Sequence, residues 1–377
     1  MNIAYITNYN ASDIHNWSGL GYYISKALID QNATLDFINQ QEKSVGLMLN
    51  TKKVIYKIMG KDLDLSREPS VVRKISLMTG SQIKPNTDIV FSPSSIPIAL
   101  LETKKPKVFY TDATFAGMIG FYEGFSKINP EAIKKANYLE QTALDSAKLV
   151  IYSSDWAANT AIKLYGASPE KIKVVPFGAN IICNRSLSDI KQISSNRSRD
   201  ECNLLYIGVD WERKGGDVAV EITQQLNNMG LKTRLHLVGN NSIPIKVLPH
   251  FVTNHGFISK SAPDGKKKLD KLFSECHFLL LPTKADCTPV VFSEANSFGL
   301  PVITTDVGGI PSIISADVNG ITFPLGTDLA EWSHYICTVF SNPSRYEELC
   351  LSSFAEYQNR LNWEKAGKTI IGYLKDL

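Results

Sequence analysis

Short apolar runs alternate with amphipathic stretches along most of the chain, and the two patterns have different periods. In the first half, runs rich in Ile, Val, Phe and Tyr predict buried strands, and stretches with a helical period lie between them. The predicted strands are Ile3–Thr7, Thr34–Ile38, Asp88–Ser92, Val108–Thr111, Leu149–Ser153 and Ile172–Pro176. The predicted helices are Leu20–Gln31, Glu131–Ser146 and Trp156–Tyr165. This alternation is typical of βα units around a parallel sheet.

The alternation stops at Cys183–Asp200, which is rich in Ser, Asn and Arg, and then resumes. We interpret this polar stretch as an interdomain linker or a surface excursion. The second series has strands at Asn203–Ile207, Thr233–Val238, His277–Leu281 and Val302–Thr304, and helices at Gly216–Met229, Lys266–Ser274 and Val290–Phe298. The tail Asp328–Leu377 has a largely helical pattern.

The two series predict an α/β fold of two domains, since 377 residues exceed the size at which one hydrophobic core stops growing. We place an N-terminal Rossmann-like domain at 1–182 and a C-terminal one at 183–359. A final helix at about 360–377 is expected to pack back on the first domain. In open α/β sheets, ligands bind beyond the carboxyl ends of the strands, so the strand-to-helix loops are where chemistry is expected.

Composition narrows the choice of function. A formal net charge of +3 argues against a partner that is duplex nucleic acid. The six cysteines show no metal-ligand spacing and are interpreted as free thiols in a reducing cytoplasm. The N-terminus "MNIAYITNYN" lacks the features of a signal peptide, and no apolar run approaches the length of a membrane span. We therefore expect a cytoplasmic protein, either free or peripheral at the inner face of the membrane.

Two glycine-containing loops precede predicted helices. "SGLGYY" places Gly19 and Gly21 ahead of a helix, where the backbone can approach an anion, although a tight turn explains the pair equally well. "IGVDWERKGGD" follows a strand that ends at Gly208 and places Arg213 and Lys214 before a helix. Cations are unfavourable at a helix N-terminus, so this order makes sense if an anion fills the gap between them. The alternative is a solvated pair on a surface loop.

A third loop, within "KADCTPVVFSEANSFGLPV", carries Asp286 and Glu294 on either side of an apolar centre. Both acids could simply stabilise the start of a helix. The following "GLPVITTDVGGIPSII" adds a strand and a diglycine turn, so one domain directs two cations, two carboxylates and this turn towards its strand ends. Cations and helix N-termini hold phosphates, and carboxylates accept from vicinal hydroxyls. A nucleotide sugar would use all of these groups.

At this point the chain resembles the retaining glycosyltransferases of family 4, also called glycosyl transferases group 1. Four blocks carry the resemblance: "GVDWERKGG", "LHLVG", "ADCTPVVFSEANSFGLPVITTDVGGIPSII" and "NGITFP". The N-terminal half matches more loosely through "YTDATF" and "SSDWAANTAIKLYGASPEKIKVVPFGAN". The resemblance implies the GT-B fold, in which two Rossmann-like β/α/β domains face each other across a cleft.

The resemblance also implies roles for individual residues. Glu294 is expected to accept hydrogen bonds from the ribose, and Asp286 to face hydroxyls of the donor sugar. Lys214, with Arg213 beside it, would neutralise the diphosphate leaving group. The remaining donor-binding residues are expected to act through backbone or close approach: Gly19, Gly21, Gly208, Thr288, Pro289, Val290, Val291, and His255, Phe257 and Ile258 near the base.

The chain departs from the family pattern at three places. Asp286 stands where many members have Glu, and Val209 stands where many have Arg directly after the glycine. Where many members have His after a strand of the first domain, this chain reads "YTDAT", with Asp112 as the nearest polar residue. Asp112 could bind a donor hydroxyl or orient the acceptor, and it could equally be a structural residue similar to a helix N-cap.

The resemblance therefore predicts a retaining, metal-independent hexosyltransferase that acts in cell-surface polysaccharide or glycoconjugate synthesis. A nucleotide sugar would serve as co-substrate with no cofactor and no metal site, and the acceptor would be a glycan, a lipid-linked sugar or a small molecule. Alternatives of the same fold are a nucleotide-sugar epimerase and an inactive nucleotide-sugar-binding protein. A dehydrogenase is less favoured, because the first strand lacks GxGxxG.

One further stretch bears on the acceptor. Residues 43–84 contain nine Lys or Arg and three Asp or Glu, interleaved with apolar residues in "GLMLNTKKVIYKIMGK". Such a basic amphipathic segment could rest on anionic lipid. It could equally be a solvated helix face beside a core stripe.

Overall fold

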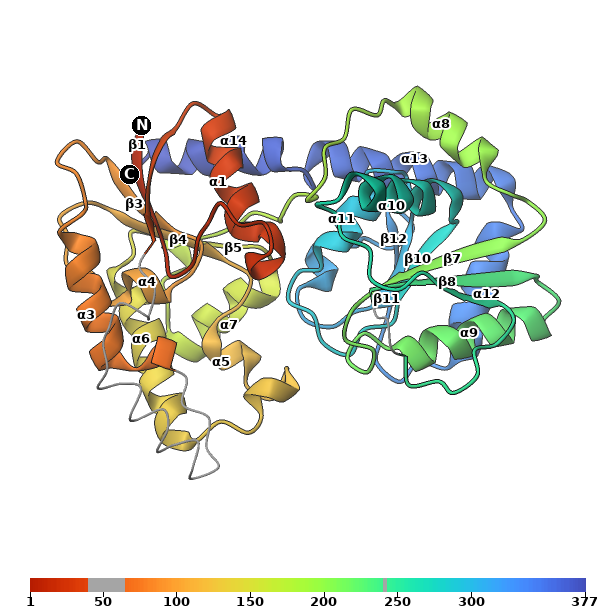
Figure 1. Ribbon diagram of the computed structural model, residues 1–377, viewed down its shortest axis with the longest axis horizontal. Coiled ribbons are helices and arrows are strands. Elements are labelled where there is room, and N and C mark those ends of the chain that lie inside the picture. Colours follow the sequence, from red (N-terminus) through yellow and green to blue (C-terminus); the bar gives the residue numbers. More distant parts are fainter. Residues whose placement is uncertain (40–64, 240–242) are drawn as a thin grey trace. The chain divides into compact units, whose positions relative to one another are not determined.

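The computed structural model describes residues 1–39, 65–239 and 243–377, which form two compact units. Unit 1 comprises Met1–Pro176 and Trp363–Leu377, and unit 2 comprises Phe177–Asn362. The chain therefore leaves unit 1 after β6 and returns to it for its last helix (Figure 1). From the sequence, the first domain was expected to end at residue 182 and the chain to return to it at about residue 360.

Unit 1 is built around a sheet of six parallel strands in the order β2-β1-β3-β4-β5-β6. Helices cover both faces: α1 and α14 lie on one, and α3, α4 and α6 lie on the other (Figure 1). The elements are β1 Asn2–Thr7, α1 Leu20–Asp30, β2 Thr34–Asn39, α3 Pro69–Gly80, β3 Ile89–Ser92, α4 Ile96–Ala99, β4 Lys107–Thr111, α5 Phe115–Met118, α6 Pro130–Ser146, β5 Leu149–Tyr152, α7 Asp155–Tyr165, β6 Ile172–Val174 and α14 Trp363–Lys375.

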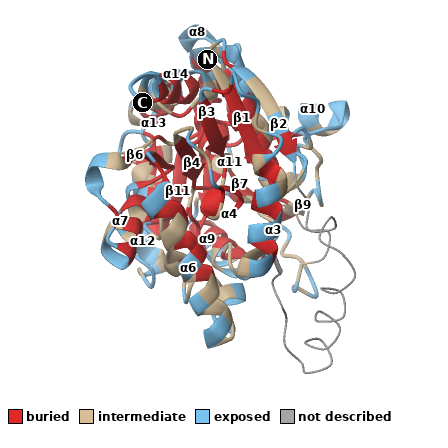
Figure 2. Ribbon diagram, turned by 90° about the vertical axis from the view of Figure 1, so that its left-hand side faces the viewer, coloured by how far each residue is buried: buried red, intermediate tan, exposed pale blue. Residues whose placement is uncertain are grey.

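The central strands of unit 1 are buried along their whole length because helices cover both faces of the sheet. Every residue of β3, β4 and β5 is buried, and Figure 2 shows β1, β3 and β4 as buried strands beneath helices that expose their outer faces. The edge strand β2 is instead exposed or partly buried at every residue except Ile38. The continuous apolar runs that predicted these strands are thus explained by two-sided burial.

Unit 2 has a second sheet of six parallel strands, in the order β12-β11-β10-β7-β8-β9. Helices α8, α10, α11 and α13 cover one face, and α9 and α12 cover the other (Figure 1). The elements are α8 Leu187–Asn196, β7 Cys202–Ile207, α9 Gly216–Asn228, β8 Thr233–Val238, β9 Val252–Asn254, α10 Pro263–Glu275, β10 Phe278–Leu281, α11 Val290–Asn296, β11 Val302–Thr305, β12 Gly320–Phe323, α12 Leu329–Phe340 and α13 Pro343–Asn359.

Counted within unit 2 alone, this strand order is 3-2-1-4-5-6, the order of the dinucleotide-binding Rossmann fold. The order reverses between β7 and β10, which are neighbours in the sheet although they are separated in the chain by β8 and β9. Loops that leave the two strands at such a reversal diverge to opposite faces of the sheet. A ligand position is therefore expected beyond the carboxyl ends of β7 and β10.

The prediction of a linker at Cys183–Asp200 was wrong, because this stretch forms α8 and belongs to unit 2. Ser186 and Asp189 form a reciprocal capping box at its start. Arg197, directly after the helix, is buried, and its guanidinium donates to the backbone oxygens of Phe273, Ser274, Phe298 and Gly299 and to the hydroxyl of Tyr346. Arg197, which belongs to a stretch expected to be exposed, thus connects α8 to the ends of α10 and α11 and to α13.

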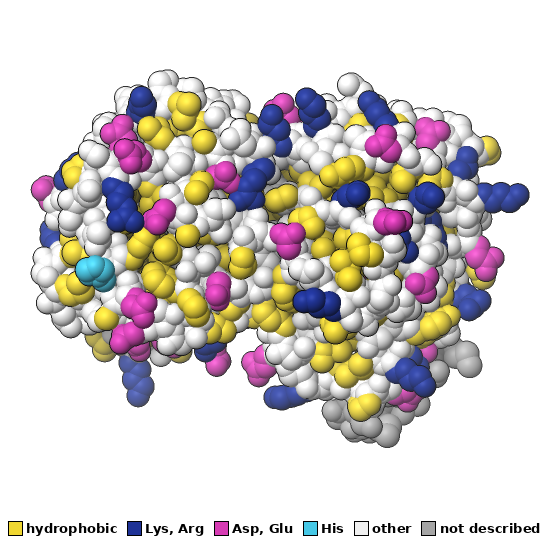
Figure 3. All heavy atoms as spheres, turned by 180° about the vertical axis from the view of Figure 1, so that it is seen from behind, with side chains coloured by type: hydrophobic (Ala, Val, Ile, Leu, Met, Phe, Trp, Pro, Cys, Tyr) yellow, Lys and Arg dark blue, Asp and Glu magenta, His cyan; other side chains and the backbone are white. Residues whose placement is uncertain are grey.

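The surface carries charges of both signs. On the face shown in Figure 3, Lys and Arg side chains are interspersed with Asp and Glu in both units rather than gathered by sign. No helix within the described residues is long and apolar enough to cross a membrane. The basic stretch 43–84 lies outside the described residues up to 64, and its remainder forms a short 3-10 turn at Leu65–Arg67 and helix α3.

Candidate functional site

The loop after β7 carries the predicted cations, and its shape depends on a close approach to the neighbouring strand. Gly215 caps α9 with φ 71°, and a Cβ placed there would lie 2.0 Å from the backbone oxygen of Pro282 at the end of β10. A second contact joins the loops, since the Lys284 N–H donates to the Arg213 carbonyl over 2.7 Å. The β7 and β10 loops are therefore held together through their backbones.

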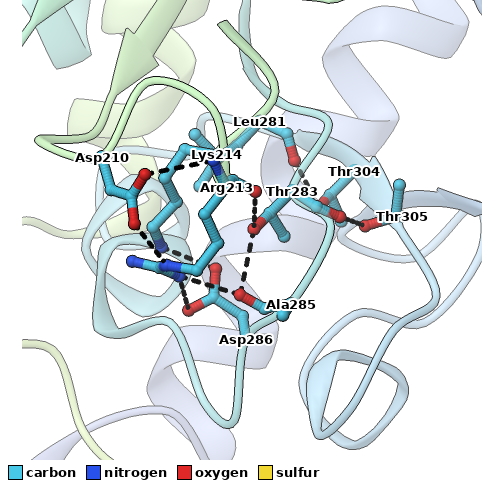
Figure 4. A network of polar contacts seen from close by, with 9 residues as sticks. All are labelled: Asp210, Arg213, Lys214, Leu281, Thr283, Ala285, Asp286, Thr304 and Thr305. Atoms are coloured by element: carbon cyan, nitrogen blue, oxygen red, sulfur yellow. Dashed lines mark hydrogen bonds and ion pairs between the residues drawn. The ribbon is translucent and has the colours of Figure 1, made fainter. Parts of the chain in front are cut away.

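Arg213 and Lys214 have different surroundings although they are neighbours in the chain. The Arg213 guanidinium donates to Asp210 over 2.9 Å and to the Ala285 carbonyl over 2.8 Å, and it lies 3.6 Å from Asp286 (Figure 4). These contacts hold the loop in place. Lys214 lies deeper: its side chain is 12% exposed, against 26% for Arg213. The alternative of a solvated pair on a surface loop was therefore wrong.

The anion between these cations is Asp286. The Lys214 ammonium lies 2.6 Å from Asp286 Oδ2, and the two side chains meet from the β7 and β10 loops (Figure 4). A lysine ammonium has three N–H donors, so it can bind Asp286 and still donate to a ligand oxygen. The structure thus brings together the predicted cation and the first predicted acid, at the reversal point of the sheet.

Hydroxyl groups and a glycine fix the loop that carries Asp286. Thr283 Oγ1 donates to the Arg213 carbonyl over 3.1 Å, and Thr304 Oγ1 donates to the Leu281 carbonyl over 2.7 Å (Figure 4). The Gly309 N–H of the diglycine turn donates to the Asp286 carbonyl over 3.2 Å. Two cations, two carboxylates and this turn were expected to converge at the strand ends of one domain, and these contacts join the cations, Asp286 and the turn.

Glu294 lies on α11, and its side chain is 0% exposed. Both of its carboxylate oxygens lie 2.5 Å from the ammonium of Lys260, which comes from the loop between β9 and α10. The sequence did not point to Lys260, because that loop has no periodic pattern that would place the side chain. The second predicted acid therefore has a lysine partner of its own.

Thr288, Pro289, Val290 and Val291 form the entry to α11. Pro289 is the N-cap and provides no side-chain cap, and α11 begins at Val290. The first N–H groups of a helix have no acceptor within the helix, so the amides of Val290 and Val291 are suited to an external acceptor. Gly208, at the end of β7, lies beside Lys214: a Cβ there would be 3.0 Å from Lys214 Cγ.

The stretch predicted to lie near the base shows two kinds of residue. The His255 N–H donates to the Leu237 carbonyl, and the His255 ring stacks on His236, with 3.0 Å between Nε2 and Nδ1. Burial, followed by the neighbouring His255, lowers the pKa of His236 to about 4. Ile258 packs against the core, whereas Phe257 is exposed. His255 is exposed as well, so this stretch presents an imidazole and a phenyl ring at the surface.

In unit 1 the glycine loop follows β1 and is covered by an aromatic ring. Gly19 has φ 83°, and Trp17 and Ser18 before it also lie in the left-handed region, which non-glycine residues rarely adopt. A Cβ on Gly21 would lie 2.4 Å from the hydroxyl oxygen of Tyr9, and that hydroxyl is buried with no hydrogen-bond partner within the described residues. Tyr9 was not predicted, although it lies in the same loop between β1 and α1.

Asp112 follows β4 and is close enough to Tyr9 to affect it: burial first, and the charge of Asp112 second, raise the pKa of Tyr9. The helix after β4 is capped by Thr114, whose Oγ1 accepts from the Gly117 N–H over 3.1 Å. The reading of Asp112 as an N-cap does not apply to this helix. Asp112 and the glycine loop, which are distant in sequence, are therefore close in unit 1.

A third buried carboxyl belongs to Glu140 of α6, which the sequence did not single out. Its Oε2 accepts from the Ser95 hydroxyl over 2.6 Å, in the loop beyond the carboxyl end of β3. Burial raises the pKa of Glu140 to about 7, although Ser95 and Arg67 act in the opposite direction.

Among the residues that the structure describes, no group of three or more His, Cys, Asp or Glu side chains is arranged to hold a metal ion.

Part of the chain is similar to a known family. Residues 201–342 match the family model of glycosyl transferases group 1. This stretch contains the β7 and β10 loops, Lys260 and α11, so the resemblance stated from the four sequence blocks is confirmed at the level of group 1.

Among curated relatives, a D-inositol 3-phosphate glycosyltransferase of Xylanimonas cellulosilytica is 23% identical over 245 residues, which cover 62% of this chain and 58% of that protein. An uncharacterized 41.2 kDa protein in the cps region of Klebsiella pneumoniae is 24% identical over 225 residues, covering 59% and 58%. The matches thus span less than two thirds of the length of these relatives.

Solved structures match over the whole chain. Sucrose-phosphate synthase from Thermosynechococcus elongatus gives a TM-score of 0.72 at 16% identity, covering 100% of this chain and 98% of that one. Anabaena Alr3699/HepE, solved in complex with UDP, gives 0.66 at 16% identity, covering 100% of both chains. The fold, two Rossmann-like α/β domains each with a six-stranded parallel sheet, is that of the GT-B class, as predicted.

Proposed function

We propose that this protein is a retaining, metal-independent glycosyltransferase of family 4 that moves a hexosyl group from a nucleotide sugar to a hydroxyl of a glycan, lipid-linked or small-molecule acceptor. The observation that carries the proposal is the convergence of Lys214, Arg213 and Asp286 at the reversal point of the unit 2 sheet. In such sheets this is where the phosphates of a nucleotide bind.

In the proposed reaction, the bond between the anomeric carbon and the diphosphate breaks, and an acceptor oxygen takes the place of the diphosphate on the same face. Charge develops on the leaving diphosphate and on the sugar ring. Lys214, backed by Arg213, would stabilise the diphosphate, and the amides of Val290 and Val291 would donate to phosphate or sugar oxygens. Groups held in advance around developing charge provide the largest single contribution in many enzymes.

Asp286 and Glu294 would bind the hydroxyls at the two ends of the donor. Asp286 would face the sugar, close to the cations that hold the diphosphate, and Glu294 would accept from the ribose. Phe257, exposed on the stretch His255–Ile258, would cover the base. In unit 1, the loop at Gly19 and Gly21 would approach the diphosphate, and Asp112 would bind a donor hydroxyl or orient the acceptor.

Two comparisons support the choice of donor class. Anabaena Alr3699/HepE has been solved in complex with UDP and with UDP-glucose, and this chain has the same fold at 16% and 17% identity. The Xylanimonas cellulosilytica relative is a glycosyltransferase by name. We extend the proposal to cell-surface polysaccharide or glycoconjugate synthesis in the cytoplasm, in keeping with the cps region that names the Klebsiella pneumoniae relative.

The test is a panel of UDP-, GDP- and ADP-sugars, read first by thermal shift and then by release of free nucleotide, with and without a mixed acceptor pool. We expect one donor to raise the melting temperature and to be consumed faster when acceptor is present. NMR of the product would then show the donor's anomeric configuration retained. Excess EDTA should leave the rate unchanged.

Other outcomes identify the alternatives. Conversion of the donor sugar to an isomer without acceptor would identify an epimerase. A thermal shift without any turnover would identify a binding protein. No shift with any nucleotide sugar would overturn the proposal. Sedimentation with anionic and neutral liposomes tests the peripheral membrane contact through residues 43–84 separately, and binding only to anionic liposomes is the expected result.

A further inference from the structure

Lys260 occupies both oxygens of the carboxylate that the proposed function assigns to the ribose. Its ammonium lies 2.5 Å from Glu294 Oε1 and 2.5 Å from Oε2. A single nitrogen at equal distances from both oxygens must lie in the fork between them. A pair of vicinal hydroxyls that donates one hydrogen bond to each oxygen approaches a carboxylate from the same side. The ammonium and a ribose diol therefore compete for one position.

The two partners differ in their freedom to move. The Glu294 side chain is 0% exposed and belongs to a helix, whereas the Lys260 side chain is 43% exposed and belongs to a loop. A lysine has a long flexible stem and a strongly hydrated head, so Lys260 can turn towards water when another donor takes its place. The carboxylate cannot leave, and burying it without a partner would be costly. In the parent protein the fork is therefore filled by either the lysine or the diol, and only the lysine can make way.

We propose that Lys260 is a specificity-determining residue of the donor site: it fills the ribose position at Glu294 while no nucleotide is bound, and the vicinal diol of a ribonucleotide displaces it. This inference rests on the proposed function, in which Glu294 binds the ribose. A ligand that lacks the two hydroxyls cannot replace the ammonium, and its binding leaves the ion pair closed. The ligand class that opens the pair is therefore a nucleoside diphosphate with free 2′- and 3′-hydroxyls.

Competition of this kind has a defined thermodynamic signature. In the parent protein, the diol must first break the ion pair, so part of its interaction with Glu294 is lost. In Lys260→Met the fork is empty, and the diol gains the full interaction. Loss of one positive charge also weakens attraction of any diphosphate, but it does so equally with and without the hydroxyls. The ratio of the two dissociation constants, rather than either one, isolates the coupling between Lys260 and the ribose.

The experiment compares UDP with 2′,3′-dideoxy-UDP by isothermal titration calorimetry on the full chain, with the GDP and ADP pairs run in parallel. The proteins are the parent, Lys260→Met, Lys260→Gln and Lys266→Met. Lys266 is the matched control, because it is an exposed lysine a few residues further along the chain and pairs with Asp270 rather than with Glu294. Thermal unfolding of each variant reports whether the fold is retained.

We expect Lys260→Met to raise the preference for the ribonucleotide over the dideoxynucleotide by about fivefold or more relative to the parent, as expected when a competing interaction of ordinary strength is removed. Lys260→Gln, which keeps an N–H donor without charge, should give a smaller increase and provides the result if Lys260→Met fails to fold. Lys266→Met should leave the ratio unchanged.

An unchanged ratio in both Lys260 variants would overturn the inference, because the ribose would then not meet this pair. A reduced ratio would overturn it as well, since Lys260 would then support the diol instead of competing with it. Either result, with UDP still bound by the parent, leaves the proposed transfer reaction intact, although an unchanged ratio would also remove the ribose from Glu294. Failure of the parent to bind any of the nucleoside diphosphates or nucleotide sugars would instead overturn both.

Discussion

The carboxyl ends of the two sheets are built from different chemistry. In unit 2 each of the two buried carboxylates has a lysine partner: Asp286 pairs with Lys214 at 2.6 Å, and Glu294 pairs with Lys260 at 2.5 Å. In unit 1 the buried carboxyl of Glu140 accepts instead from the hydroxyl of Ser95. The same unit also contains a glycine loop and the buried hydroxyl of Tyr9.

This difference suggests that the two units bind different chemical groups in the proposed reaction. Unit 2 holds fixed charges of both signs, which suit a ligand with a charged diphosphate and hydroxyl-rich ends. Unit 1 has hydroxyls and a carboxyl whose pKa of about 7 leaves it partly protonated at neutral pH, which suits an uncharged hydroxyl-bearing group. Substitutions of the cation in the β7 loop, of a glycine in each unit and of each buried carboxyl test this difference.

The largest effect is expected from Lys214→Ala. This change removes the inward cation of the β7 loop, and the proposed transfer should fall on the order of a hundredfold to a thousandfold, as for the loss of one preorganised donor to a developing anion. The measurement is the steady-state rate of nucleotide release with acceptor. Lys284→Ala is the control, because this neighbouring lysine is exposed and contacts Glu212 only at 3.9 Å. A folded Lys214→Ala protein with the parental rate would remove Lys214 from the mechanism.

The two glycine loops should respond differently to the same substitution. In Gly215→Ala the new Cβ meets the Pro282 backbone oxygen at 2.0 Å in a left-handed conformation, and we expect a loss of about 2–4 kcal/mol in the free energy of unfolding. In Gly21→Ala the Cβ meets the Tyr9 hydroxyl at 2.4 Å, and that ring can turn aside, so the loss should be about 1 kcal/mol. Urea unfolding followed by circular dichroism measures both.

Equal losses at the two glycines would show that Tyr9 is held as firmly as the Pro282 backbone. In that case the glycine loop of unit 1 would be as rigid as the cation loop of unit 2. A loss confined to Gly215→Ala supports a loop in unit 1 that is closed by a movable side chain.

Much of the fold could be predicted because burial on both faces leaves a direct mark on the sequence. The runs at 108–110 and 278–281 are apolar at every position, as expected for a strand covered on both sides. The stretch 183–200 was misread because its helix has few large apolar residues, and because Arg197 is buried by acceptors that come from distant elements. The spacing of Ser186 and Asp189, which is typical of a capping box, was the sequence signal that could have predicted the start of this helix.

The candidate site could be predicted only in part, for a related physical reason. Lys214 and Asp286 both lie in loops at predicted strand ends, so the sheet topology alone brings them near each other. Lys260, Tyr9 and Glu140 reach their positions through irregular loops or across helix packing, and no local pattern specifies this. A sequence shows which residues directly follow a strand, but it does not show which side chains from other elements pack against the end of that strand.

The buried carboxyl of unit 1 should make stability depend on pH. The pKa of Glu140 is about 7 in the folded protein against 4.5 as its ordinary value, so the folded state holds a proton that the unfolded state has released between these values. Stability therefore falls as the pH rises from about 4.5 to 7. Glu140→Gln lacks this dependence, and relative to the parent it should gain about 2–3 kcal/mol over that range.

Thermal unfolding of the parent and of Glu140→Gln at a series of pH values measures this gain. Glu131→Gln on the same helix is the control, because Glu131 is exposed and pairs with Lys135. Parallel pH profiles for the parent and Glu140→Gln would show that Glu140 stays charged in the folded state. The contrast between a partly protonated buried carboxyl in unit 1 and the ion-paired carboxylates of unit 2 would then be lost.

The smallest effect separates the two ion pairs of unit 2. In Asp286→Asn, Lys214 and Arg213 lose their shared carboxylate and have little access to water, since their side chains are 12% and 26% exposed. The expected cost is about 1–2 kcal/mol, below that of breaking a fully buried pair. In Glu294→Gln the unpaired lysine is 43% exposed and can turn to solvent, so the cost should be under about 0.5 kcal/mol.

Urea unfolding of both variants in the same buffer gives the difference directly, and high salt provides a second comparison, because screening acts more strongly on the exposed Lys260 than on Lys214. A cost in Glu294→Gln as large as that in Asp286→Asn would mean that Lys260 is fixed in place. A fixed lysine could not make way for a ribose. The difference in the free energy of unfolding between these two variants therefore tests, without any nucleotide, whether the Lys214–Asp286 pair is permanent and the Lys260–Glu294 pair can open.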